Sequence, residues 1–86
     1  MDLYCQMGDE LRLLFNDLFD PRLEGAVRKQ MARILGIAKQ IGGSIKEEAE
    51  RLNADVLQFL QRPGNPKLLA KMKQHALRLE QQMREL

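Results

Sequence analysis

The chain has 86 residues, of which 44% are hydrophobic and 30% are charged, and its formal net charge is +2. Disordered chains combine low hydrophobicity with high net charge, so this composition indicates a folded protein. A chain of this length buries only about 60 to 65% of the surface that it exposes when unfolded. We therefore expect a single helical domain over residues 1–86 with a thin core, and either marginal stability or a binding partner.

The sequence contains one cysteine, Cys5, which cannot form a disulfide bond within the chain. It shows no charged segment followed by an apolar leader, and no apolar run long enough to cross a membrane. We therefore expect a cytoplasmic protein that does not associate with membranes.

Residues 3–19 predict the first helix, because apolar residues recur there every three or four positions, as on one helix face. These residues are Tyr4, Met7, Leu11, Leu14 and Leu18. Phe15 and Phe19 widen this face. Gly8 lies within the run and costs about 1 kcal/mol relative to alanine, so a helix that begins only at Asp9 is an alternative.

A second helix is predicted over residues 21–41. The residue before a proline avoids the helical conformation, and proline favours the first helical position, so Asp20 is expected to cap a helix that starts at Pro21. The apolar face of this helix contains Leu23, Val27, Met31, Ile34, Ala38 and Ile41. Ala32 and Gly36 would permit close approach of a neighbouring backbone, and a merely tolerated glycine is an equal alternative.

Two adjacent glycines, Gly42 and Gly43, predict the end of the second helix, because each costs about 1 kcal/mol in a helix interior. Ser44 and Glu47 have the spacing of a capping box, in which the two side chains bond to each other's backbone N–H groups. The third helix is therefore expected over residues 44–61.

The segment 62–66 predicts a chain reversal, because Gly64 permits positive φ, Asn65 can cap a helix and Pro66 suits its first turn. A fourth helix is expected over residues 66–85, antiparallel to the third. Its apolar residues form a narrow seam of the kind that one helix of a coiled coil offers another. The seam contains Leu69, Met72, Ala76, Leu79, Met83 and Leu86.

These patterns together predict the all-α class, and within it a small antiparallel bundle of three to four helices with a helical hairpin around residues 62–66. The apolar pattern continues across Gly42 and Gly43 nearly in phase. One long bent helix over residues 21–61 is therefore an alternative to two helices, and we favour two.

The residue types that catalysis needs are scarce. The chain has one serine, one cysteine, one histidine and no threonine, and Ser44 is accounted for as a helix cap. His75 has only lysine, methionine, arginine and leucine one turn away on its predicted helix, so no metal-ligand group accompanies it there. We expect no catalytic residues, no metal and no cofactor, and hence a protein that is not an enzyme.

Basic residues gather on two of the predicted helices. Arg22, Lys29 and Arg33 share one side of the second helix, and Lys67, Lys71 and Arg78 share one side of the fourth. Each side could follow a line of phosphates, so a small nucleic-acid-binding protein is the alternative function. It is the less favoured one, because acidic residues follow the glycine corner and would repel phosphates.

The predicted function is a non-catalytic protein–protein interaction module, such as a regulator, an inhibitor, an adaptor or a chaperone-like subunit. It would act through apolar helix faces on a protein partner or on a second copy, and we expect a homodimer through the seam of the last helix. The predicted partner-binding residues are Leu14, Phe15, Leu18, Phe19, Leu69, Met72, Leu79 and Met83. For the first helix, the alternative is that its broad apolar face packs inside its own bundle.

Overall fold

The computed structural model describes residues 2–86, and within this range the chain forms four α-helices and no strand. The helices are α1 (Leu3–Asp17), α2 (Glu24–Ile41), α3 (Gly43–Gln61) and α4 (Pro66–Arg84), and a short 3₁₀ helix, η1 (Pro21–Leu23), precedes α2. None of the described helices is both long and apolar enough to span a bilayer. The predicted all-α bundle is therefore confirmed.

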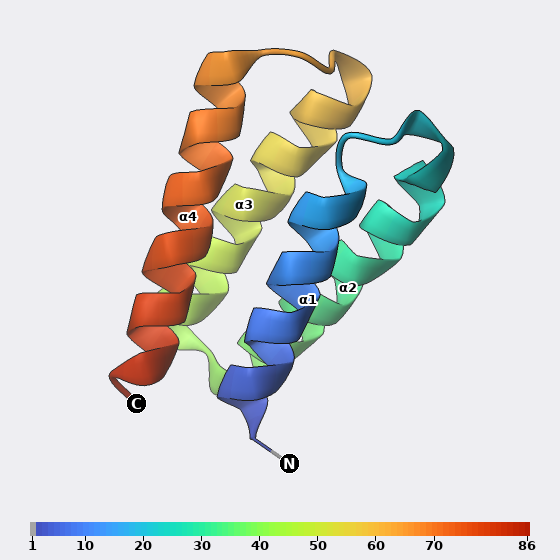
Figure 1. Ribbon diagram of the computed structural model, residues 1–86. Coiled ribbons are helices and arrows are strands. Elements are labelled where there is room, and N and C mark those ends of the chain that lie inside the picture. The colour runs from blue at the N-terminus through green and yellow to red at the C-terminus, as the bar shows by residue number, and fades with distance from the viewer. Residues whose placement is uncertain (1) are drawn as a thin grey trace.

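Consecutive helices run antiparallel and form a ring in the order α1, α2, α3, α4 (Figure 1). Helices α2 and α4 are diagonal in this ring, and α1 packs more sparsely against α4 than each helix packs against the next along the chain. Both chain ends lie at one end of the bundle, and the α1–α2 and α3–α4 connections lie at the other. We call the second end the loop end.

The core runs along the centre of the ring, and every helix contributes one apolar stripe to it. The buried apolar side chains are Met7, Leu11, Leu14, Leu18, Val27, Met31, Ile34, Ile37, Ala38, Ile45, Ala49, Leu52, Val56, Phe59, Leu68, Met72, Ala76, Leu79 and Met83. They recur at helical spacing, so the periodicity that predicts the helices also identifies the faces that pack together.

The glycine pair separates α2 from α3. Gly42 has φ +81° and ψ −167°, a combination that is essentially restricted to glycine, and Gly43 has φ +61°. The two helices are therefore distinct, and the alternative of one bent helix over residues 21–61 is excluded. The capping box predicted for Ser44 is wrong: α3 already begins at Gly43, which places Ser44 inside its first turn, and Gly42 at the N-cap position makes no side-chain cap hydrogen bond.

Capping side chains define the other helix starts. Helix α1 begins at Leu3 rather than Asp9, because the Asp2 carboxylate accepts a hydrogen bond from the Tyr4 backbone N–H at 2.9 Å. Gly8 is thus tolerated inside a capped helix. At α4, the Asn65 side chain accepts hydrogen bonds from two backbone N–H groups, as predicted from its place before a proline.

The start of the second helix differs from the prediction in one detail. The Asp20 carboxylate accepts a hydrogen bond from the backbone N–H of Arg22 at 3.0 Å, so it caps as predicted, but the turn that it caps is η1 and α2 proper starts at Glu24. Ala32 and Gly36 are exposed, and a Cβ built on Gly36 would meet nothing within 4 Å. The close backbone approach considered for these two residues does not occur.

Two glycine substitutions should therefore change stability in opposite directions. Gly42→Ala should lower the free energy of unfolding by about 1 to 3 kcal/mol, because alanine is strained at the backbone angles of Gly42. Gly36→Ala should raise it by about 0.5 to 1 kcal/mol, because alanine favours a helix interior and has room there. Urea denaturation of the two variants and the wild type measures these changes. Equal changes in the free energy of unfolding at both positions would contradict the turn that Gly42 forms between α2 and α3.

Candidate functional site

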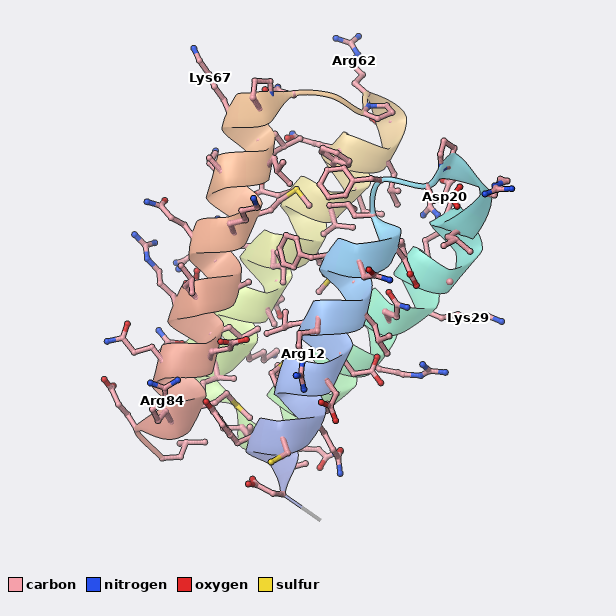
Figure 2. All side chains as sticks on the ribbon, in the orientation of Figure 1. Arg12, Asp20, Lys29, Arg62, Lys67 and Arg84 are labelled. Carbon is pink, nitrogen blue, oxygen red and sulfur yellow. The ribbon has the colours of Figure 1, made fainter. Side chains whose placement is uncertain are left out.

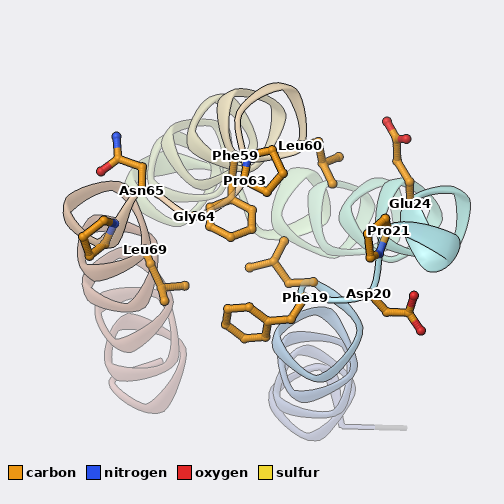
Figure 3. Close-up of a pocket in the computed structure, with 12 residues that line it drawn as sticks. Phe19, Asp20, Pro21, Glu24, Phe59, Leu60, Pro63, Gly64, Asn65 and Leu69 are labelled. Carbon is orange, nitrogen blue, oxygen red and sulfur yellow. The ribbon is translucent and has the colours of Figure 1, made fainter.

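A pocket of about 450 Å³ opens at the loop end of the bundle. We call it the end pocket. It is lined by residues from η1, α2, α3 and α4 and from both connections, namely Leu18, Phe19, Asp20, Pro21, Glu24, Phe59, Leu60, Pro63, Gly64, Asn65, Pro66 and Leu69. Figure 3 views it in close-up, with Phe19 and Leu69 on facing sides. Its lining is mainly apolar, which suits an apolar side chain from a ligand or a partner.

Phe19 is the most exposed aromatic side chain of the described residues, with 61% of its surface accessible. It follows α1 and packs edge-to-face on the ring of Phe59, with the ring centroids 6.1 Å apart and an interplanar angle of 89°. The preceding residue, Leu18, is buried in the core and anchors this part of the chain. Phe19 is therefore held in place while most of its ring faces solvent.

The walls of the end pocket are stiffened by proline. Pro21 begins η1, Pro66 begins α4, and Pro63 lies in the loop before Gly64, whose φ of +97° turns the chain. The Asn65 cap adds two hydrogen bonds to the same loop. The pocket is thus formed in the free chain, so a ligand would not have to order it.

Two carboxylates are the charged groups among the described residues that line the end pocket. Asp20 is bonded through both oxygens to the guanidinium of Arg22, and these bonds, with one from the Arg22 backbone N–H, lower the pKa of Asp20. Glu24 pairs with Arg28 at 3.0 Å. Both carboxylates point away from the pocket in Figure 3, so the interior stays apolar and its α2 side carries the charge.

The structure divides the eight predicted partner-binding residues into two groups. Five are buried in the core of the bundle, namely Leu14, Leu18, Met72, Leu79 and Met83. In the folded chain these side chains are covered by its own helices, which corrects the assignment of Leu14, Met72, Leu79 and Met83 to a partner-binding surface, whereas Leu18 also lines the end pocket. Within the predicted seam of the last helix, Met72, Ala76, Leu79 and Met83 pack inside the bundle, so these four residues are not free to form the expected homodimer contact.

The other three predicted residues lie beside the opening between α1 and α4. Phe15 and Leu69 are half-buried against the core, and Phe19 is exposed. Phe19 and Leu69 both line the end pocket, although they are fifty positions apart in the chain. Phe15 lies on α1 and does not line the end pocket. The structure therefore brings Phe19 and Leu69 together at the end pocket and leaves Phe15 outside it.

The opposite end of the α1–α4 seam is closed by a polar contact. Arg84 donates hydrogen bonds to the Tyr4 hydroxyl from Nη2 at 3.1 Å and from Nε at 3.3 Å, and its guanidinium lies 5.9 Å from the centre of the Tyr4 ring. The bond to Tyr4 raises the pKa of Arg84 above its usual range. The contact between α1 and α4 is therefore closed at the chain ends, whereas the end pocket lies beside it at the loop end.

A buried polar cluster joins α3 to α4, and the sequence analysis missed it. The Glu48 carboxylate lies 2.5 Å from Nδ1 of His75 and 3.1 Å from Nη1 of Arg51, and Asp55 lies 3.2 Å from Nε2 of His75. Glu48 and Asp55 are two turns apart on one side of α3, which was the available signal. Its partner His75 is 27 positions from Glu48, so a search within one helix could not find it.

This cluster is not arranged as a metal site. Within residues 2–86 no three histidine, cysteine or acidic side chains are grouped so that they could hold a metal ion. Glu48 and Asp55 contact opposite nitrogens of the same imidazole ring, so the three groups do not converge on one point. The arrangement instead ties two helices together through a polar bridge.

The basic faces of α2 and α4 do not form one surface. Arg22 on η1 pairs with Asp20, and on α2 Arg28 and Arg33 pair with Glu24 and Glu10, respectively. Helices α2 and α4 are diagonal in the ring, so their outer faces point in different directions. At the loop end, Arg62 in the α3–α4 connection and Lys67 in the first turn of α4 point outward (Figure 2). A straight nucleic acid could follow only one of the two predicted faces at a time.

Two leucines on α4, one buried and one exposed, allow the contribution of the core to stability to be tested. Leu79→Ala should lower the free energy of unfolding by about 2 to 5 kcal/mol, because Leu79 is fully buried within the chain. Leu77→Ala is the matched control, and because 66% of Leu77 is exposed it should change the value by less than about 0.5 kcal/mol. Urea denaturation measures both. If Leu79→Ala weakened only self-association and left unfolding unchanged, the intramolecular seam would be contradicted.

Comparisons with models of protein families, with curated proteins and with solved structures found no match for this chain. The features of the bundle that bear on function are the apolar end pocket and the exposed ring of Phe19, which lines it.

Proposed function

We propose that this chain is a non-catalytic protein-interaction module that binds an apolar segment of another protein in the end pocket. The observation that carries the proposal is the exposure of Phe19 beside a preformed apolar pocket of about 450 Å³. The other aromatic rings of the chain are buried or half-buried. Exposed aromatic residues beside a desolvated pocket are the typical anchors of protein interfaces.

The size of the site favours a segment of a partner over a large flat interface. A pocket of this volume lies within the range of about 300 to 1,000 Å³ that is usual for compact ligands. The bundle measures 34 × 23 × 16 Å between Cα atoms, so its end is narrow. A stable interface between folded proteins buries about 800 Å² on each side, more than this narrow end readily offers. An amphipathic helix with one or two large apolar anchors fits better.

The charges around the site add a preference in the partner. The carboxylates of Asp20 and Glu24 lie on the α2 side of the end pocket, and Arg22 holds the pKa of Asp20 low, so Asp20 remains ionised at neutral pH. Each of these carboxylates is paired with an arginine, Asp20 with Arg22 and Glu24 with Arg28, so charges of both signs alternate on this side and their sum is zero. The proposed partner segment therefore combines an apolar anchor with polar neighbouring residues rather than with charges of a single sign.

This function belongs to the class of regulatory, inhibitory, adaptor or chaperone-like subunits. Each of these acts by covering or presenting a segment of another protein, and none requires a reacting group in the module. The rigid walls of the end pocket support such a role, because a preformed site loses little conformational entropy on binding. A second copy of the chain is the competing occupant, and the experiment below distinguishes it.

Replacement of Phe19 by a photo-crosslinking phenylalanine analogue in the native host tests the proposal. Cross-links should form from position 19 to another protein, whereas the same analogue at Leu77, an exposed position outside the end pocket, should not form them. The cross-linked protein is then purified and titrated against the variants. Phe19→Ala should weaken its binding at least about tenfold, because hot-spot anchor residues contribute about 2 kcal/mol or more and tenfold corresponds to about 1.4 kcal/mol.

Leu77→Ala is the matched control, because it removes an exposed apolar side chain of similar size from α4 and should change the affinity less than about twofold. Equal loss of affinity in both variants would contradict the end pocket as the site. Cross-links from position 19 to a second copy of this chain alone would contradict a partner of different sequence.

A further inference from the structure

The outer side of α4 carries a line of polar residues, mostly basic, that the proposed function does not use. Lys67, Lys71, Gln74 and Arg78 follow one another at intervals of three or four positions, so they share one side of the helix. All four residues are exposed, and none of them lines the end pocket. We call them the α4 stripe, and we propose that the α4 stripe binds the phosphate backbone of a nucleic acid.

The positive charge of the α4 stripe is not neutralised within the chain. Residues 62–79 contain five cationic residues and no acidic one. Among residues 2–86, no acidic side chain forms an ion pair with Lys67, Lys71 or Arg78. By contrast, the arginines of η1 and α2 are all paired with acids. Of the two basic faces predicted from the sequence, the one on α4 therefore offers the more available charge to an external anion.

Two carboxylates of α3 lie at the contact with α4, and they face the interior of this contact rather than the α4 stripe. Glu48 and Asp55 both contact the ring of His75, and their side chains are only 3% and 13% exposed. Glu48 is also paired with Arg51. On α4 itself the first acid is Glu80, which follows the stripe in the chain. No carboxylate thus interrupts the line from Lys67 to Arg78.

A polar hollow beside the first turn of α4 extends this surface. It has a volume of about 330 Å³ and is lined by Gln58, Gln61, Arg62, Asn65 and Leu68. Arg62 points outward from the bundle, as does Lys67 (Figure 2). The Asn65 side-chain oxygen accepts the capping bonds of α4, which leaves the NH₂ group of this amide as a donor. Guanidinium, ammonium and side-chain amide groups are those that contact phosphate oxygens in nucleic-acid complexes.

The residue types on this surface favour a nucleic acid over an acidic protein. Lysine is depleted in protein–protein interfaces, whose centres are apolar, whereas phosphates are contacted by lysine, arginine, asparagine and glutamine. The α4 stripe has no apolar member, and the apolar residue of the hollow, Leu68, is buried. The rise of an α-helix places Lys67 and Arg78 about 16 Å apart along the axis, which is about five nucleotide steps of one strand.

The salt dependence of DNA binding tests the proposal. Fluorescence anisotropy of a labelled duplex of about 20 base pairs gives the association constant at several salt concentrations. A plot of its logarithm against the logarithm of the salt concentration should have a slope of about −3, because the three cations of the stripe each displace about one counterion. The affinity should therefore fall about 60-fold between about 50 mM and about 200 mM salt.

The double variant Lys71→Gln, Arg78→Gln should make the slope less steep by about two and weaken binding at least about tenfold at about 50 mM salt. The matched control is Lys29→Gln, Lys39→Gln, which removes the same charge from exposed positions of α2 and should keep the wild-type slope. Equal changes of slope in the two double variants, or no binding by the wild type at about 50 mM salt, would overturn the proposal.

A competition experiment separates a nucleic acid from other polyanions. Polyglutamate should displace the labelled duplex only at a concentration of charges at least about tenfold higher than unlabelled duplex, because its charges are less dense and release fewer counterions. Equal displacement by polyglutamate, or by vesicles of anionic lipid, would contradict a nucleic-acid partner. The variant Lys71→Gln, Arg78→Gln should retain the cross-links from position 19, so failure of this proposal is distinguishable from failure of the end pocket.

Discussion

The burial of four apolar stripes against one another is the constraint on which the rest of this structure depends. Each helix has one apolar face, and the ring order directs all four faces to a common axis. Once the ring closes, the apolar groups on these inner faces are covered, while single leucines on the outer faces, such as Leu77, stay exposed. At the loop end, Phe19 stays exposed beside the end pocket.

The four helix contacts differ in kind, and this difference positions the candidate site. The α3–α4 contact combines apolar packing with the buried polar bridge of Glu48, His75 and Asp55, whereas the α1–α4 contact is sparse and is closed by Tyr4 and Arg84 at the chain ends. At the loop end the same seam diverges into the end pocket, whose walls are held by prolines and the Asn65 cap. A pocket with stiff walls thus lies at the loop end, beside the sparsest contact of the ring.

The helical spacing of apolar residues and the positions of glycine, proline and capping residues predict the helices well, because both signals lie within a few neighbouring residues. Asn65 before Pro66 marks the start of α4, and the glycine pair marks the α2–α3 corner. Periodicity does not show whether an apolar face is covered by the same chain or by another. Leu79 was therefore assigned to a partner although it is buried within the bundle. The pairing of His75 with Glu48 depends on the register between two helices, which no single-helix pattern contains.

The most direct test of the account is a chemical-shift map of the isotope-labelled protein titrated with the partner that cross-links at position 19. The account predicts that shifts concentrate on the end pocket, at Phe19, Leu69 and the 62–66 loop, while the buried methyl groups of Leu79 and Met72 keep their positions. Shifts concentrated on the outer faces of α2 or α4, or a general loss of the dispersed core signals, would contradict it.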